Sequence, residues 1–248
     1  MHGLGMYLRP MRFFYAPQVE QPIHVLDAQE AKHLSKVLRA KAGDQVVITD
    51  GVGGRFEGVI QSLDKRECTM AIEKASFVPE PQPQLMLVVA PTKSIDRWEW
   101  LLEKATEIGV SDIQPVWTHR SERKSLKMDR CQRVLISALK QSQRHWLPRL
   151  RDPMPWSEFL SGPLAVDFDG RYLAHCEPDE DKGHLMNSLL GPGRNVWVAI
   201  GPEGDFTQDE IQAARALEVT PVSLGDARLR TETAGVAAVH MLQLAQLS

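Results

Sequence analysis

The sequence predicts an α/β protein with two domains, in which a small β-barrel precedes a larger domain of alternating strands and helices. Three observations support this prediction. Residues 1–76 contain short strand-like runs, residues 77–84 are rich in proline, and residues 85–248 alternate apolar runs with segments of helical periodicity. A chain of 248 residues is long enough for two such domains.

In the N-terminal domain, apolar runs and alternating residues predict strands over 46–49, 55–60 and 68–72. The glycine-rich segment Asp50–Gly54 separates the first two and predicts a hairpin. Apolar residues at helical spacing predict one helix over 29–38, which begins after Asp27 as its N-cap. Several short strands and one helix in so short a segment indicate a small β-barrel.

The boundary between the domains is predicted near residue 80. Pro79, Pro81 and Pro83 lie within the segment 77–84, and this density of proline disfavours both helix and central strand. We therefore expect the segment to be a linker.

The C-terminal domain is predicted to begin with a strand over 85–90, whose continuous apolar run is typical of a strand buried on both faces. Helical periodicity predicts helices over 98–108, 129–143, 207–217 and 236–247. Gly109 ends the first of these, and Thr207 with Glu210 is expected to form a capping box at the start of the third. Further strands are predicted over 113–117, 164–168, 172–176, 196–200 and 221–224. This alternation indicates a sheet of mainly parallel strands covered by helices.

Composition argues against several classes of protein. With 43% hydrophobic and 25% charged residues, the chain is typical of a soluble globular protein. No apolar run approaches the roughly 18 residues of a membrane span, and residues 1–10 lack the apolar core of a secretory signal. The cysteines Cys68, Cys131 and Cys176 are odd in number and widely spaced, which argues against a disulfide framework and a zinc site. We therefore expect a cytoplasmic protein that contacts no membrane.

The charge of the chain is unevenly distributed. The segment 119–151 contains ten basic and two acidic residues, a net charge of +8 in a chain whose total is −3. A concentrated basic surface on a mildly acidic protein favours binding of a polyanion such as RNA. The alternative is a solvated helix surface, although such surfaces usually mix the two signs.

Two loops near the C-terminus are the strongest candidates for a binding site. Each follows a predicted strand: Gly201–Asp205 after 196–200, and Leu224–Ala234 after 221–224. Ligands of open α/β sheets bind beyond the carboxyl ends of the strands, so the two loops are expected to share one pocket. The first loop can equally be a tight turn, and in the second Thr231 or Thr233 can be a helix N-cap. An N-cap does not explain Arg228 and Arg230 at the end of a buried strand.

Other motifs are weaker. Asp167 and Asp169 after a predicted strand suggest an aspartyl phosphatase, but the residues that follow do not fit that class and a turn is favoured. The histidines show neither the spacing of a metal site nor that of a catalytic triad. We predict no metal.

In combination the motifs resemble the ribosomal small subunit methyltransferase E family of the SPOUT superfamily. The resemblance covers nearly the whole chain, and Asp205 departs from it, because many members have glycine there. The matching motifs are Arg12–Phe14, His33–Arg39, Gly43-Asp44, Asp50-Gly51, Lys104–Val110, Arg120-Ser121, Gln141 with Arg144, Gly201–Gly204, Leu224-Gly225 and Leu229–Ala234.

This resemblance implies a PUA-like RNA-binding barrel followed by a SPOUT domain whose chain forms a deep trefoil knot. It implies an enzyme of small-subunit ribosome maturation, a methyltransferase that modifies N3 of a specific uridine in 16S rRNA with S-adenosylmethionine as cofactor. The cofactor is expected to contact Cys176, Gly201, Pro202, Glu203, Gly204, Leu224, Gly225, Leu229, Arg230, Thr231 and Ala234.

For the chemistry, Arg230 is predicted to stabilise the uracil oxyanion and Glu232 to accept the N3 proton. A structural ion pair with Glu203 or Glu232 is the alternative role of Arg230. RNA phosphates are expected to contact Arg12, His33, Arg39, Arg120, Arg123, Lys124 and Arg144. Two further alternatives are a non-catalytic RNA-binding factor of ribosome assembly, and a SPOUT methyltransferase that acts on another RNA nucleotide.

The predicted helix 236–247 is apolar around most of its circumference. A helix on the surface of a single domain needs only one apolar stripe, which it buries against that domain. Related knotted methyltransferases bury such helices across a two-fold axis. We therefore expect a homodimer through the C-terminal domain.

Overall fold

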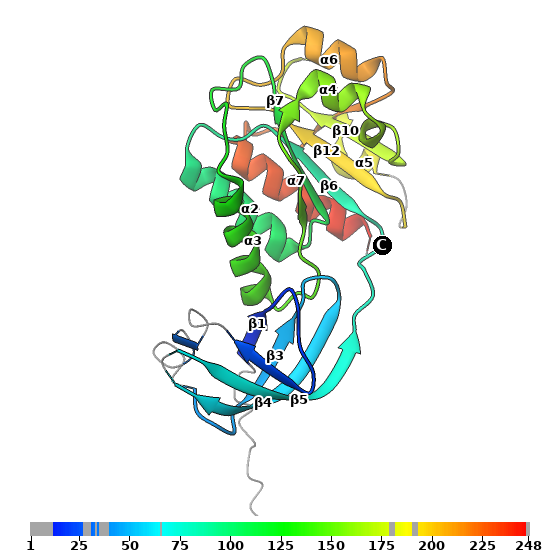
Figure 1. The fold of residues 1–248 in the computed structure, drawn as a ribbon. Helices are drawn as coiled ribbons and strands as arrows, with labels where there is room; N and C mark the ends of the chain where they lie inside the picture. Colours follow the sequence, from blue (N-terminus) through cyan, green and yellow to red (C-terminus); the bar gives the residue numbers. More distant parts are fainter. Residues whose placement is uncertain are drawn as a thin grey trace, which may run out of the picture. The chain divides into compact units, whose positions relative to one another are not determined.

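The computed structural model describes residues 12–26, 31–32, 34, 40–64, 66–178, 182–189 and 193–246. The chain divides into two compact units. One comprises residues 1–80 together with 139–146, and the other comprises 81–138 and 147–248 (Figure 1).

The first unit is built on a five-stranded sheet of order β1-β3-β4-β5-β2. The strands are β1 (Arg12–Tyr15), β2 (Ile23–Leu26), β3 (Gln45–Thr49), β4 (Gly54–Leu63) and β5 (Cys68–Phe77). β3 and β4 form the predicted hairpin, and the remaining pairs are antiparallel except for β1 with β3, which is parallel. β1 and β2 have only four residues each and were not predicted from the sequence. β5 extends to Phe77, the first residue of the predicted linker. Of the helix predicted over 29–38, the structure describes only residues 31, 32 and 34, which are helical.

The second unit contains a parallel sheet of order β11-β13-β10-β12-β6-β7-β8, with β9 paired to β7. Its strands are β6 (Leu85–Val89), β7 (Asp112–Trp117), β8 (Arg149–Leu150), β9 (Met154–Pro155), β10 (Gly170–Ala174), β11 (Gly183–His184), β12 (Val196–Ile200) and β13 (Thr220–Ser223). β6 and β12 are buried at every position, as continuous apolar runs predict for central parallel strands.

Helices cover both faces of this sheet (Figure 1). Leu85, Leu87 and Val89 of β6 belong to the core that includes α2 (Ile95–Ile108), α3 (Met128–Ser142) and α7 (Thr231–Ala245). The alternate residues Met86 and Val88 belong to the core under α4 (Trp156–Ser161) and α6 (Gln208–Arg215). The short helices η1 (Pro163–Ala165) and α5 (Leu185–Ser188) also belong to this unit.

Two helix boundaries follow from local chemistry. α2 ends at Gly109, which takes the left-handed conformation with φ 113°. At the start of α6, Thr207 and Glu210 form the predicted capping box.

Two predictions about the elements were wrong. The strand expected over 164–168 is the helix η1 followed by a turn, because Pro163 favours the first position of a helix and Asp169-Gly170 favours a turn. The last helix begins at Thr231, five residues before the predicted start at Val236. The polar segment Thr231–Thr233 is therefore its first turn, and the N-cap is Arg230, without a side-chain capping bond, rather than Thr231 or Thr233.

Within the described residues no helix is both long and apolar enough to cross a membrane.

Candidate functional site

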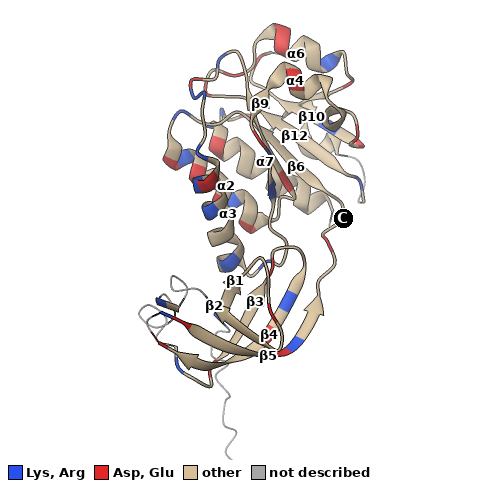
Figure 2. Cartoon of the chain, in the orientation of Figure 1, with Lys and Arg blue, Asp and Glu red and all other residues tan. Residues whose placement is uncertain are grey.

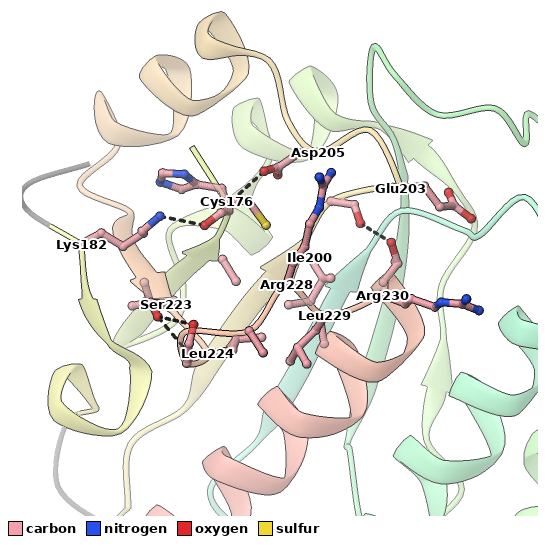
Figure 3. Close-up of a pocket in the computed structure, with 18 of the residues that line it drawn as sticks. Cys176, Lys182, Ile200, Glu203, Asp205, Ser223, Leu224, Arg228, Leu229 and Arg230 are labelled. Atoms are coloured by element: carbon pink, nitrogen blue, oxygen red, sulfur yellow. Dashed lines mark hydrogen bonds between the residues drawn. The ribbon is translucent and has the colours of Figure 1, made fainter. Parts of the chain in front are cut away.

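The candidate site lies where three neighbouring strands end. β10 pairs with β12 on one side and β13 on the other, all parallel, and Ala174 lies opposite both Ile200 and Val222. The loops that follow these strands therefore emerge at one edge of the sheet, as expected for a ligand site of an open α/β sheet (Figure 3).

The loop after β12, residues 201–206, is bonded to four neighbouring segments. Thr231 Oγ1 of α7 donates to the Gly201 carbonyl (3.0 Å), and Arg120 donates to the Gly204 carbonyl (2.7 Å). The Glu203 carboxylate accepts the backbone N–H of Lys93 (2.9 Å), and the Asp205 carboxylate accepts that of Cys176 (2.6 Å). The loops after β6, β7 and β10 and the first turn of α7 are thus all attached to this one loop.

The loop after β13 contains Gly225 with φ +124°, a conformation that residues with a side chain rarely adopt. Ser223 stabilises this turn, because its hydroxyl accepts from the Gly225 N–H (3.1 Å) and contacts the Gly225 carbonyl (3.2 Å). A Cβ at residue 225 would meet nothing within 4 Å, so the backbone borders open space.

Together the loops enclose a cavity of about 750 Å³, a volume in the range of sites for small ligands and cofactors. It contains ten of the eleven predicted cofactor residues. The exception is Gly204, which the Arg120 side chain covers, with Arg120 Cβ 3.3 Å from the position of an added Cβ. The complete lining is Ala174, His175, Cys176, Lys182, Ile200, Gly201, Pro202, Glu203, Asp205, Val222, Ser223, Leu224, Gly225, Asp226, Ala227, Arg228, Leu229, Arg230, Thr231 and Ala234.

The lining includes three charged residues that were not predicted from the sequence as cofactor contacts: Lys182, Asp205 and Arg228. Lys182 belongs to the segment before β11, where no motif pointed to it, whereas Asp205 and Arg228 lie inside the two recognised loops. In Figure 3 the Arg228 side chain extends toward Asp205, and Arg230 points away from both Asp205 and Cys176. Arg228 and Arg230 are both exposed.

The structure places Glu232, the predicted proton acceptor, outside the lining of the cavity. Thr231 and Ala234 line the cavity, whereas Glu232 does not. Successive residues of a helix are rotated by roughly 100°, and this rotation carries Glu232 to another face of α7. There it is 7% exposed, and its Oε1 lies 3.6 Å from Nε of Arg97 on α2. This ion pair involves only Oε1, and Oε2 is buried without a hydrogen-bond partner among the described residues, so the role of Glu232 as proton acceptor stays a prediction.

The predicted RNA-binding residues are placed in different surroundings. Arg123 Nε donates to the Thr92 carbonyl (2.9 Å), so Arg123, like Arg120, holds a neighbouring backbone segment. Lys124 is exposed and makes one long hydrogen bond of 3.4 Å to the Thr118 carbonyl. His33 and Arg39 lie outside the described residues.

In the first unit, Arg12 forms an ion pair with Asp44 (2.9 Å). Arg144 is half-buried, and desolvation lowers its pKa from the ordinary value. Both guanidinium groups are therefore partly engaged within their own unit.

Acidic side chains also border the basic segment. Figure 2 shows Lys and Arg interleaved with Asp and Glu on α2 and α3. Glu99 of α2 pairs with Arg130 of α3, and Glu122 pairs with Lys93 at 2.7 Å. Glu99 of α2 thus offsets part of the positive charge that the sequence segment shows by itself, whereas Glu122 belongs to the segment and pairs with a lysine outside it.

No group of three or more His, Cys, Asp or Glu residues that could hold a metal occurs among the described residues. The two acids Asp167 and Asp169 follow η1 rather than a strand. Asp169 instead accepts the backbone N–H of Asn195 (2.9 Å), which is a structural role.

Comparison with known proteins places these features in a family. A family model for the RNA methyltransferase domain matches residues 79–243, and one for the RNA methyltransferase PUA domain matches residues 26–73. The ribosomal RNA small subunit methyltransferase E of Synechocystis sp. is 30% identical over 243 residues, which cover 95% of this chain and 78% of that protein.

Two solved structures extend the comparison. The crystal structure of a probable rRNA-methyltransferase from Porphyromonas gingivalis is 36% identical with a TM-score of 0.86, covering 96% of this chain and 99% of that one. The ribosomal RNA small subunit methyltransferase E of Neisseria gonorrhoeae, bound to S-adenosyl methionine, is 27% identical with a TM-score of 0.83 over 94% of this chain and 97% of that one.

Proposed function

The chain belongs to the ribosomal RNA small subunit methyltransferase E family, and on this basis we propose that it methylates N3 of a uridine in 16S rRNA with S-adenosylmethionine. The observation that carries the proposal is the cavity of about 750 Å³ at the ends of β10, β12 and β13. It combines the glycine-rich loops of the family motifs with arginines at its exposed edge.

The cavity fits the cofactor in shape and chemistry. Ile200, Val222, Leu224 and Leu229 supply apolar walls for an adenine ring, and the open backbone at Gly225 supplies polar groups beside them. The exposed carboxylate of Glu203 and the cations Lys182 and Arg228 provide charges for the amino acid part of the cofactor. When bound, the cofactor supplies an activated methyl group.

Arg230 is the residue we propose for the chemistry. Uridine N3 carries a proton and becomes a good nucleophile only when its anion is stabilised. Arg230 lines the cavity and is exposed, so its guanidinium can approach a uracil oxygen and stabilise the developing negative charge. Because Glu232 does not line the cavity in this structure, the N3 proton passes either to solvent at the open edge or to Glu232 after a rearrangement of its side chain.

For RNA, we propose that phosphates contact the exposed cations whose bonds within the fold are weakest. Lys124 makes one long hydrogen bond of 3.4 Å, and Lys127 and Arg133 on or beside α3 join it as exposed basic residues. Arg12, His33, Arg39 and Arg144 remain the proposed contacts of the PUA-like unit. Arg120 and Arg123 are better explained by their bonds to backbone carbonyls, so charge reversal there would disturb the loops as well as the surface.

We further propose that the protein is a cytoplasmic homodimer, because rRNA is modified where ribosomes mature and because α7 leaves apolar side chains exposed. Leu244 on α7 is 42% exposed, and Val236 and Met241 are half-buried.

The decisive experiment is mass spectrometry of 16S rRNA from a strain that lacks the gene. The expected result is loss of N3-methyluridine and its restoration by the purified protein with S-adenosylmethionine. Retention of the modified base would refute the assignment. Cofactor binding without restoration on any 16S substrate would favour another RNA target, and RNA binding without cofactor binding would favour the non-catalytic assembly factor.

A further inference from the structure

Asp205 has an unusual position in the cofactor loop. Its φ is +62°, in the left-handed region where glycine is favoured. Among the described residues that line the cavity, Asp205 is the one residue other than glycine with this conformation. It follows a turn closed by its own N–H, which donates to the Pro202 carbonyl (2.9 Å). Aspartate tolerates this backbone conformation better than most residues but less well than glycine.

Both oxygens of the Asp205 carboxylate accept backbone hydrogen bonds. Oδ1 accepts the N–H of Phe206 (2.8 Å), which fixes the side chain on its own loop. Oδ2 accepts the N–H of Cys176 (2.6 Å), which belongs to the loop after β10. The carboxylate therefore joins two loops that form adjoining walls of the cavity (Figure 3).

A second charged side chain holds the loop after β10 from its other end. The ammonium group of Lys182 donates to the carbonyls of His175 (3.0 Å) and Glu177 (2.7 Å). Asp205 thus binds an N–H of this loop, and Lys182 binds two of its carbonyls. Hydrogen bonds to charged groups are stronger than those between neutral groups, so these two side chains are well suited to set the position of residues 175–177.

We propose that Asp205 is a positioning residue that fastens the loop 175–177 to the loop 201–206 and thereby shapes the cavity for its cofactor. This inference rests on the proposed function, because it takes S-adenosylmethionine as the ligand. It assigns Asp205 no contact with the reacting atoms. Compared with glycine, aspartate is less favourable in this backbone conformation, but its carboxylate bonds the loop 201–206 to the loop 175–177.

The test compares Asp205→Asn and Asp205→Gly with the wild-type protein. Asparagine keeps the size and tolerates the backbone conformation, but it can accept only one of the two N–H groups. Glycine removes both bonds and suits the backbone better. Asp209→Asn is the matched control, since it removes the same charge from the first turn of α6, outside the cavity.

The first measurement is hydrogen exchange of the free protein, which needs no cofactor. We expect the Cys176 amide to exchange about tenfold faster in Asp205→Gly, the change expected when one charge-assisted bond is lost, and to be unchanged in Asp209→Asn. In Asp205→Asn the acceleration should be smaller, because an amide oxygen can still accept this N–H in a weaker, neutral bond. Unchanged exchange at Cys176 in Asp205→Gly would overturn the proposal, whatever the ligand of the cavity is.

The second measurement is calorimetry with S-adenosylmethionine and with S-adenosylhomocysteine, whose sulfur is uncharged. Because the loop shapes the cavity for both, Asp205→Gly should bind each ligand about tenfold more weakly, and Asp205→Asn should weaken the two ligands equally but by less. Weaker binding of the charged ligand alone would show direct attraction of the carboxylate to the sulfonium and overturn the positioning role. Wild-type protein that binds neither ligand would refute the proposed function instead, and the exchange result would still stand.

Discussion

At the scale of single residues, the polar atoms around the cavity divide into those that bond the loops to one another and those left exposed at its edge. Thr231, Glu203 and Asp205 belong to the first group, since each bonds a backbone group of a neighbouring segment. Arg228 and Arg230 belong to the second. Substitutions in the first group, and of Arg228, should alter the affinity for the cofactor, whereas substitution of Arg230 should alter the rate of RNA methylation.

Arg230 tests this division. Arg230→Ala should lower kcat by about a hundredfold, the effect of removing one group that stabilises an oxyanion, and leave the dissociation constant of S-adenosylmethionine within a factor of about three. Steady-state kinetics and calorimetry on the same preparation measure the two quantities. Thr233→Ala, an exposed substitution in the same helical turn, is the control. Turnover close to that of the wild type would remove Arg230 from the mechanism.

Cys176 offers a direct probe of where the cofactor binds. It is exposed and lines the cavity, whereas Cys68 and Cys131 are buried and burial raises the pKa of both thiols, that of Cys68 to about 11. A maleimide should therefore label Cys176 first, because the thiolate is the reactive form. Saturating S-adenosylmethionine should slow this labelling by about tenfold or more, because a ligand that fills the cavity would cover the Cys176 thiol. Peptide mass spectrometry identifies the labelled site, and an unchanged rate would place the cofactor elsewhere.

At the scale of elements, the site depends on how closely α7 packs. Thr231 in its first turn donates a hydrogen bond to the Gly201 carbonyl of the loop 201–206, so a shift of the helix would also displace this wall of the cavity. Gly235 allows the close approach, because a Cβ there would lie 2.7 Å from Leu101 of α2 and 3.5 Å from Leu87 of β6. Small residues at such a contact determine how far a helix lies from its neighbours.

Gly235→Ala should therefore destabilise the protein despite the higher helix propensity of alanine. Overpacking a core typically costs about 1–3 kcal/mol, and the gain in propensity offsets roughly 1 kcal/mol of it. Chemical denaturation should show a lower midpoint, and affinity for the cofactor should fall with it. Thr233→Ala on the exposed side of α7 serves again as control. A midpoint equal to or above that of the wild type would mean that Leu101 moves aside without cost.

At the scale of the whole molecule, the second unit has apolar surface that its own fold leaves open. Leu244 of α7 and Trp100 of α2 are 42% and 43% exposed. α2 and α7 pack against each other, so the two exposed side chains lie on a pair of contacting helices. A two-fold interface across such a pair is the commonest way to cover it.

The dimer proposal predicts a species of about twice the 27.8 kDa chain mass in analytical ultracentrifugation at micromolar concentration. Leu244→Asp should give monomers, because it places a charge in the apolar contact. Lys140→Ala is a control on α3. Wild-type protein that sediments as a monomer would contradict the proposal. The trefoil knot implied by the family resemblance also belongs to this scale and stays a prediction.

Much of the site could be predicted from sequence because its parts are local. The strand ends at Ile200 and Ser223, the glycine turns after them and the capping box of α6 each depend on a few consecutive residues. The apolar run 85–89 likewise predicted a fully buried strand. Short elements such as β1, β2 and α4 escaped prediction because four to six residues give too little periodicity to distinguish them from loops.

What the sequence by itself determined is the order of the elements, the two loops that form most of the cavity, and the family to which they belong. Only the tertiary structure decided which side chains face the cavity and which hold it together. Arg120 covers Gly204, Asp205 binds the Cys176 amide, and Glu232 turns toward Arg97. These partners lie between 29 and 135 positions apart along the chain. Their pairing depends on which strands lie side by side and on how a helix is rotated, and both are set by packing of the whole core rather than by neighbouring residues.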